Sequence, residues 1–192
     1  MVCAGTCTQT MPGERWLKEI IEQPGAVLEL LENLKNDSSP HVRRHLAANL
    51  YDLLKRNPDP VYQVIERWQN DASPETQGTI TQALRYQIKV ADPRALRLIG
   101  YVEPKVKVID LGTEDGIFSF SLLSLSNQTQ QLQINYAGYL WGRNHRRYRK
   151  VRRLSRRQLR ANQKANYQIR LDGRWHQVEI LVNGQVVALK KL

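Results

Sequence analysis

The stretch NDSSPHVRRHLAANLYDLL, residues 36–54, returns 34 residues later as NDASPETQGTITQALRYQI, residues 70–88. Apolar residues recur at the same offset, so that Leu46 corresponds to Ile80, and further along the two copies keep the same apolar positions. Their spacing of three to four residues predicts an amphipathic helix in each copy. The repeat therefore indicates that one structural unit occurs at least twice in the first half of the chain.

Each copy has the signals that begin a helix. Ser39-Pro40 and Ser73-Pro74 place a capping hydroxyl before a proline, which is preorganised for the first helical position. A second helix is predicted to begin near Asp59-Pro60 in one copy and near Asp92-Pro93 in the other. A period of 34 residues with two helices per unit is typical of an α-solenoid.

After Gly100 the helical spacing gives way to alternation of apolar and polar residues. The alternating runs centre on Phe120, Ile134, Ile169 and Ile180. Asn183-Gly184 between two such runs is a strong hairpin signal. We expect about five to seven short strands in a small antiparallel β-sandwich. The predicted fold is multidomain, α then β, with a disordered N-terminus at 1–13, helical repeats at 14–101 and the sandwich at 105–192.

Positive charge is concentrated in one segment of the sandwich. The net charge is +11, and residues 141–164 contain eleven Lys or Arg with no Asp or Glu, while the rest of the chain is formally neutral. Such an excess indicates a polyanionic partner, because an anion relieves the self-repulsion of crowded cations. The favoured partner is the phosphate backbone of a nucleic acid, most of all DNA. An anionic protein or membrane surface, and a solvated edge that blocks aggregation, remain alternatives.

Candidate phosphate-binding residues follow from the run and from the helices. The candidates in the run are Arg143, Arg146, Arg147, Arg149, Lys150, Arg152, Arg153, Arg156 and Arg157. Arg43, Arg44 and Arg85 are expected to line the helical face. Asp52 is a candidate catalytic acid, with an ordinary surface ion pair as the alternative.

Other classes of site find little support. His41 and His45 have the i, i+4 spacing that can bind a metal, but no Glu follows in HExxH fashion, and a structural role is favoured for His45. Cys3 and Cys7 form an isolated CxxxC without a second ligand pair. The sequence predicts no metal, no cofactor and no membrane partner, and a cytoplasmic, nucleoid-associated protein.

Several motifs resemble the bacterial DNA alkylation repair proteins of the AlkC type. In the helices these are Asn36-Asp37, Val42-Arg43-Arg44, Ala48-Asn49-Leu50, Asp52, Asn57-Pro58-Asp59, Ala83-Leu84-Arg85, Asp92-Pro93 and Ile99-Gly100-Tyr101. In the strands they are Phe118-Ser119-Phe120, Ile134-Asn135-Tyr136 and Val182-Asn183-Gly184. The resemblance covers roughly residues 25–192.

The resemblance implies HEAT-like repeats followed by an immunoglobulin-like domain, and a DNA-binding protein related to glycosylases that excise N3-alkylated bases. It implies alkylated duplex as a partner, and a carboxylate such as Asp52 that stabilises the sugar cation. Gly78 and Gln82 stand where the family has Trp and His, and the family's longer N-terminal arch is missing. We therefore expect a truncated or degenerate relative. A non-catalytic nucleic-acid-binding module and a HEAT-type interaction scaffold remain alternatives.

Overall fold

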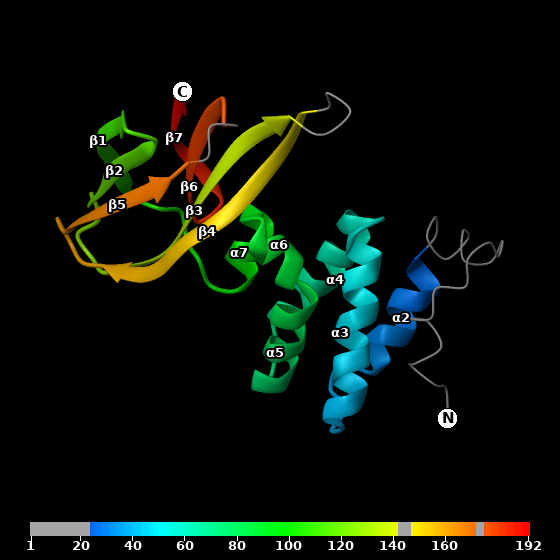
Figure 1. The fold of residues 1–192 in the computed structure, drawn as a ribbon. Helices are drawn as coiled ribbons and strands as arrows, with labels where there is room; N and C mark the ends of the chain where they lie inside the picture. Colours follow the sequence, from blue (N-terminus) through cyan, green and yellow to red (C-terminus); the bar gives the residue numbers. More distant parts are fainter. Residues whose placement is uncertain (1–23, 142–146, 172–174) are drawn as a thin grey trace. The chain divides into compact units, whose positions relative to one another are not determined.

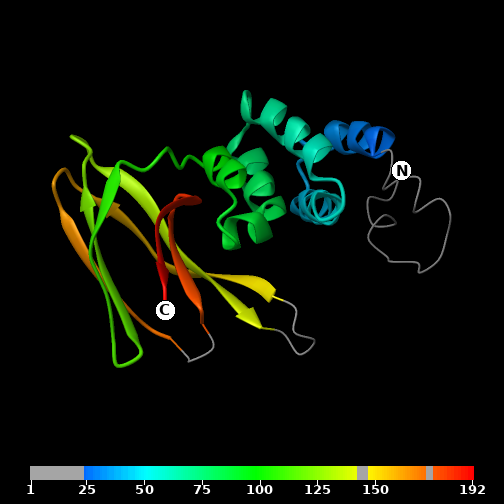
Figure 2. The same ribbon diagram turned by 90° about the horizontal axis from the view of Figure 1, so that it is seen from above.

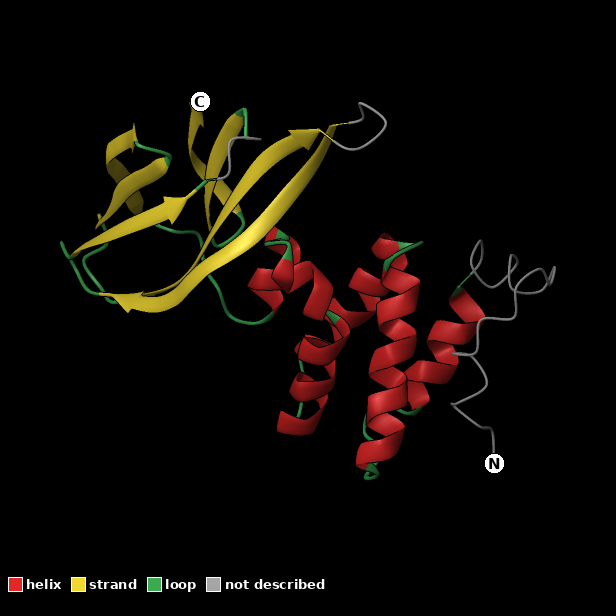
Figure 3. Ribbon diagram, in the orientation of Figure 1, coloured by secondary structure: helices red, strands yellow, loops and turns green. Residues whose placement is uncertain are grey.

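The computed structural model describes residues 24–141, 147–171 and 175–192, in which helices come first and antiparallel strands follow, as predicted (Figure 3). The helices are α2 (Gly25–Asn33), α3 (Pro40–Leu54), α4 (Pro58–Gln69), α5 (Pro74–Ala83), α6 (Arg85–Lys89) and α7 (Pro93–Leu98). The strands are β1 (Val106–Glu114), β2 (Ile117–Ser124), β3 (Gln130–Trp141), β4 (Arg147–Leu159), β5 (Lys164–Arg170), β6 (Gln177–Val182) and β7 (Gln185–Lys191). The predicted disordered segment 1–13 lies outside the described residues.

By its contacts the chain divides into two compact units, Met1–Tyr86 and Gln87–Leu192. In the first unit α3 and α5 lie side by side (Figure 1). The repeat pair Leu46 and Ile80 is fully buried, and so is the next pair, Leu50 and Leu84. The apolar positions that the repeat defines are therefore the core of this unit.

The two copies of the repeat begin their first helix differently. Ser73 caps α5, because its hydroxyl accepts a hydrogen bond from the backbone N–H of Thr76 at 3.2 Å. The predicted cap at Ser39 is wrong, since its side chain makes no capping hydrogen bond to α3. Its backbone N–H instead donates to the Asp37 carboxylate at 2.7 Å, which fixes the turn before α3. The same sequence pattern thus gives a side-chain cap in one copy and a turn held by Asp37 in the other.

The second unit contains two antiparallel sheets around one core. The sheets have the strand orders β1-β2-β5 and β4-β3-β6-β7, and Figures 1 and 2 show them as two layers. Phe118 and Phe120 of β2 meet Ile134 of β3 and Ile180 of β6 in this core. Trp175 lies over Gly138, where a Cβ atom would come within 1.8 Å of the indole Cε3. The alternating apolar residues therefore form the contact between the sheets.

Two tight turns of the same type join neighbouring strands. Asn183-Gly184 joins β6 to β7 with φ of 48° and 84°, which confirms the predicted hairpin. Asp115-Gly116 joins β1 to β2 with φ of 49° and 73°. Two successive residues with positive φ give the turn that matches the twist of paired strands.

Helices α6 and α7 pack on the outer face of the four-stranded sheet through polar groups. The Gln133 side chain is fully buried and donates a hydrogen bond to the Ile88 carbonyl at 2.9 Å. The amide oxygen of Asn183 accepts from the Gln133 backbone N–H at 2.8 Å, and its amide nitrogen donates to the Val102 carbonyl at 2.8 Å. These bonds attach the segment after residue 87 to strands β3 and β6.

Candidate nucleic-acid interface

The basic run forms one long strand at the edge of a sheet. Strand β4 contains seven of the predicted phosphate-binding residues and pairs with β3 on one side. Its other edge is unpaired in the described sheet, so it presents main-chain groups as well as cations. Arg143 and Arg146 lie outside the described residues, and so does the side chain of Arg147. The described cations therefore begin at Arg149.

A β-bulge decides which face each arginine occupies. Ile134 lies opposite Ser155 and Asn135 lies opposite Arg153, so Leu154 is an extra residue in β4. Residues that lie directly opposite in an antiparallel pair share a face. The bulge therefore reverses the alternation of side chains between Arg153 and Ser155 and sets the faces of the arginines on either side.

The arginines of β4 divide between the two faces in pairs. Arg153 and Arg156 lie opposite Asn135 and Gln133, on the outer face of β3. Arg152 and Arg157 share the other face, opposite the core residues Tyr136 and Leu132, and both are exposed because β4 is the edge strand. The strand thus presents cations on both of its faces.

Arg149 is neutralised within the protein. Its Nε and Nη2 atoms donate to one carboxylate oxygen of Glu179 at 3.0 and 2.7 Å, and the Glu179 side chain is only 10% exposed. Glu179 lies on β6, with Ala137 opposite it on β3, so the guanidinium reaches across a small residue. Removing one partner of a buried ion pair is costly, so the geometry assigns Arg149 a structural role.

Two other basic residues of the run are held by neighbours. The Nε atom of Arg156 donates to the Gln133 side-chain oxygen at 2.8 Å. Lys164 donates to the Asp110 carboxylate at 2.6 Å, and this hydrogen bond lowers the pKa of Asp110. The exposed cations from β4 onward, apart from Arg149 and Lys164, are Lys150, Arg152, Arg153, Arg156, Arg157 and Arg160.

The three helical arginines do not play one role. The Nη1 atom of Arg43 donates to the carbonyl oxygens of Asp37 and Ser38 at 2.7 and 2.9 Å, which holds the turn before α3. Arg44 is exposed on α3. The Arg85 guanidinium lies over the Tyr51 ring, 3.6 Å from its centroid. Arg44 and Arg85 are therefore the helical arginines placed at the surface.

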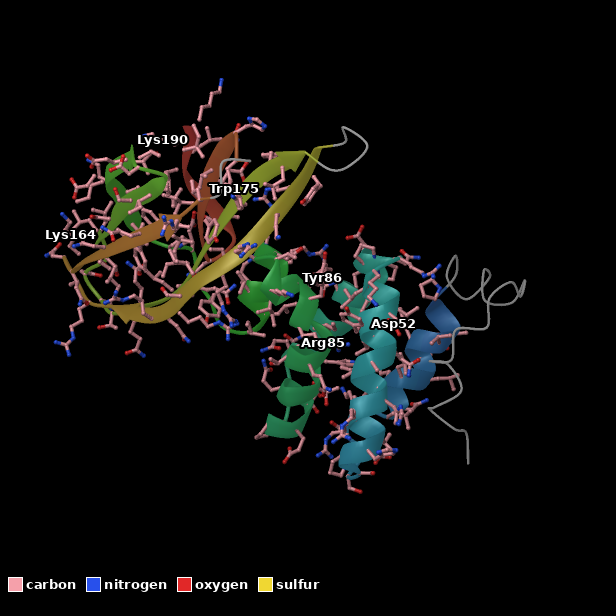
Figure 4. The ribbon with its side chains drawn as sticks, in the orientation of Figure 1. Asp52, Arg85, Tyr86, Lys164, Trp175 and Lys190 are labelled. Carbon is pink, nitrogen blue, oxygen red and sulfur yellow. The ribbon has the colours of Figure 1, made fainter. Side chains whose placement is uncertain are left out.

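Asp52 is an exposed residue with a cationic partner. Its carboxylate accepts a hydrogen bond from Lys55 at 2.9 Å, and this bond raises the pKa of the Lys55 ammonium group. Lys55 also lies over the Tyr51 ring, 4.0 Å from the centroid. Figure 4 labels Asp52 on α3 and Arg85 at the start of α6. Asp52, Lys55, Tyr51 and Arg85 thus form one polar and aromatic cluster.

Reasoning from the sequence missed Tyr51 and Lys55 in this cluster. The signal was present, since Tyr51 and Arg85 are separated by the repeat period of 34 residues. Equivalent positions on adjacent repeats lie side by side, so a stacking contact was predictable. Among the residues that the structure describes, no three His, Cys, Asp or Glu side chains are grouped to hold a metal ion. No described helix is long and apolar enough to cross a membrane.

Comparison with known proteins identifies the architecture. No protein-family model matches the chain. The uncharacterized protein YhaZ of Bacillus subtilis is 28% identical over 169 residues, which are 82% of this chain and 46% of that protein. The structure of the Pseudomonas fluorescens alkylpurine DNA glycosylase AlkC, bound to DNA containing an abasic site analog, matches 93% of this chain and 55% of its own, with a TM-score of 0.73 and 28% identity. The chain has an AlkC-like fold and spans about half the length of these two proteins.

Proposed function

We propose that this chain binds the phosphate backbone of duplex DNA through the exposed cations of β4, as a DNA alkylation repair protein of the AlkC type. In this proposal residues 14–101 are HEAT-like repeats and residues 105–192 are an immunoglobulin-like sandwich. The observation that carries it is the row of exposed Lys and Arg side chains from Lys150 to Arg160, on a strand whose outer edge is unpaired in the described sheet.

Charge and geometry favour a polyanion over an aggregation-blocking edge. Two or three cations are enough to protect an edge strand, whereas six exposed cations follow one another here. Duplex DNA has phosphates along two strands, and cations on both faces of one strand can contact both. Each neutralised phosphate releases bound counterions, which makes binding favourable at low salt.

The repair context rests on the AlkC-like fold. The Pseudomonas protein is an alkylpurine DNA glycosylase and was solved on DNA with an abasic site analog. By analogy, the bond between C1′ and the base nitrogen breaks, its electrons leave with the base, and water adds to C1′. In this chain Asp52 is the proposed carboxylate that stabilises the cationic sugar, and Lys55 must release it to do so.

Replacing Arg152, Arg153 and Arg157 together by Ala is expected to flatten the salt dependence of DNA binding. With six phosphate contacts, the affinity of the unaltered chain is expected to fall about 10³-fold between 50 and 200 mM salt. Each lost contact reduces the slope of log K against log salt by about 0.9, so the triple variant loses roughly 2.7. Fluorescence anisotropy with a labelled duplex measures both slopes.

A matched triple variant provides the control for this experiment. Arg97, Lys107 and Lys191 are also exposed but lie outside the run, and their replacement by Ala removes the same charge. We expect this control to keep nearly the original slope. If both triple variants lose the same slope, binding depends only on net charge, and the assignment to β4 is wrong.

Release of a free alkylated base tests the catalytic part. The full chain is expected to release 3-methyladenine from alkylated DNA, and Asp52→Asn is expected to slow release about 10²-fold while binding is unchanged. Asp71→Asn is the control, because Asp71 is an exposed carboxylate 3.5 Å from Lys35. Chromatography of the released base gives the rate. An unaltered chain that binds DNA but releases no base would reject catalysis and leave the non-catalytic binding module.

A further inference from the structure

The two histidines of α3 are held close together by their ring nitrogens. The Nε2 atoms of His41 and His45 are 3.3 Å apart, with ring centroids 4.7 Å apart and planes inclined by 78°. Two neutral imidazoles at this distance share one proton, which makes one Nε2 the donor and the other the acceptor. His41 is exposed and His45 is half-buried, so the pair is accessible from solvent. Neither residue takes part in the proposed DNA-binding strand.

We propose that His41 and His45 together bind one tetrahedral transition-metal ion of the Zn²⁺ class. Zinc binds imidazole nitrogen at about 2.0–2.1 Å. Two such nitrogens at a tetrahedral angle lie about 3.3 Å apart, whereas at the right angle of a square-planar ion they lie about 2.9 Å apart. The observed 3.3 Å matches the tetrahedral case. The helix already holds both nitrogens at the separation that such an ion requires.

Local contacts keep the pair in place and keep positive charge away from it. The His45 carbonyl accepts a hydrogen bond from the Asn49 side chain at 2.9 Å, one turn further along α3. The Arg43 guanidinium is directed to the carbonyls of Asp37 and Ser38, in the turn that precedes the helix. When the ion binds, the shared proton moves to the Nδ1 atom of its own ring, and both Nε2 lone pairs become ligands.

The remaining ligands are water. No group of three or more His, Cys, Asp or Glu side chains is present among the described residues, so the protein supplies two ligands here. Structural zinc sites use four protein ligands, and this site is therefore expected to bind more weakly and exchange its ion readily. The open positions leave room for an exogenous ligand.

Titration of the full chain with Zn²⁺ alone tests the proposal. Cys3 and Cys7 are first replaced by Ser, because thiolates compete for zinc. Isothermal titration calorimetry is expected to give one histidine-dependent site. His41→Ala and His45→Ala are each expected to weaken it about tenfold or more. His176→Ala is the control, because His176 is exposed on the other unit, and we expect the affinity to be unchanged.

Nitrogen NMR of the imidazoles gives a second readout that does not depend on affinity. Zinc is expected to shift the Nε2 resonances of His41 and His45 together, while His176 keeps its position. A double variant, H41A/H45A, that still binds Zn²⁺ with the original affinity would place the ion elsewhere and overturn the proposal. A chain whose Nε2 resonances stay unmoved at millimolar Zn²⁺ would overturn it as well.

Discussion

Gly184→Ala is expected to lower the free energy of unfolding of the C-terminal unit by about 3 kcal/mol. Two effects add. Gly184 has a φ of 84°, which costs any other residue about 1 kcal/mol. The added Cβ would also lie 2.7 Å from the Ala91 carbonyl oxygen and 2.8 Å from the Pro93 Cα. Both are backbone atoms, so the start of α7 must move away from the β6–β7 turn.

The chain contains a matched control for this substitution. Gly116 occupies the same place in the β1–β2 turn, with a φ of 73°, and its Cβ would come no nearer than 3.8 Å to the Leu171 carbonyl oxygen. Gly116→Ala therefore carries the backbone cost alone, about 1 kcal/mol. Urea unfolding and hydrogen exchange of residues 93–98 compare the two variants. Equal losses of stability would contradict the proposed contact between Gly184 and α7.

Gly138→Ala is expected to destabilise the same unit by about 3 kcal/mol, because the indole of Trp175 must leave the core. The added Cβ would lie 1.8 Å from Cε3 and 2.0 Å from Cζ3 of that ring. Trp175 is only 8% exposed and packs against Tyr136, with ring centroids 5.7 Å apart. No rotation of the alanine methyl group relieves the overlap.

A double-mutant cycle isolates this contact. In a Trp175→Ala background the space is already open, so adding Gly138→Ala should cost less than about 1 kcal/mol. Gly112→Ala is the control on another strand, where the Cβ would lie 3.3 Å from the flexible Ser119 hydroxyl. Hydrogen exchange in β3 and β6 reports the stability. Additive losses in the cycle would show that the indole does not fill this space.

The sequence predicts the hairpin at Asn183-Gly184 but not its twin at Asp115-Gly116. The difference lies in the flanking strands. Regular alternation leads into Asn183, whereas in β1 the register shifts between Ile109 and Gly112, and Asp110 has a φ of 56°. A bulge breaks the period of two on which strand prediction depends. Strand β1 was therefore not predicted, although its turn signal is equally strong.

The candidate site shows the same dependence on local irregularity. The cluster of cations is readable from composition, but the bulge at Leu154 decides which of them share a face. The ion pair that removes Arg149 from the set is formed with Glu179, 30 residues later. Pairing across β3 is a tertiary fact, and composition has no signal for it. The proton-sharing distance between His41 and His45 likewise follows from rotamers and not from spacing alone.

The buried Gln133 side chain has a practical consequence for dividing the protein. It donates to the Ile88 carbonyl and accepts from Arg156, so it is satisfied only while residues before 90 are present. An excised β-sheet half that starts at Lys105 would open this amide to water and unfasten an arginine of the basic strand. A fragment meant to keep the native surface should therefore start at or before Gln87.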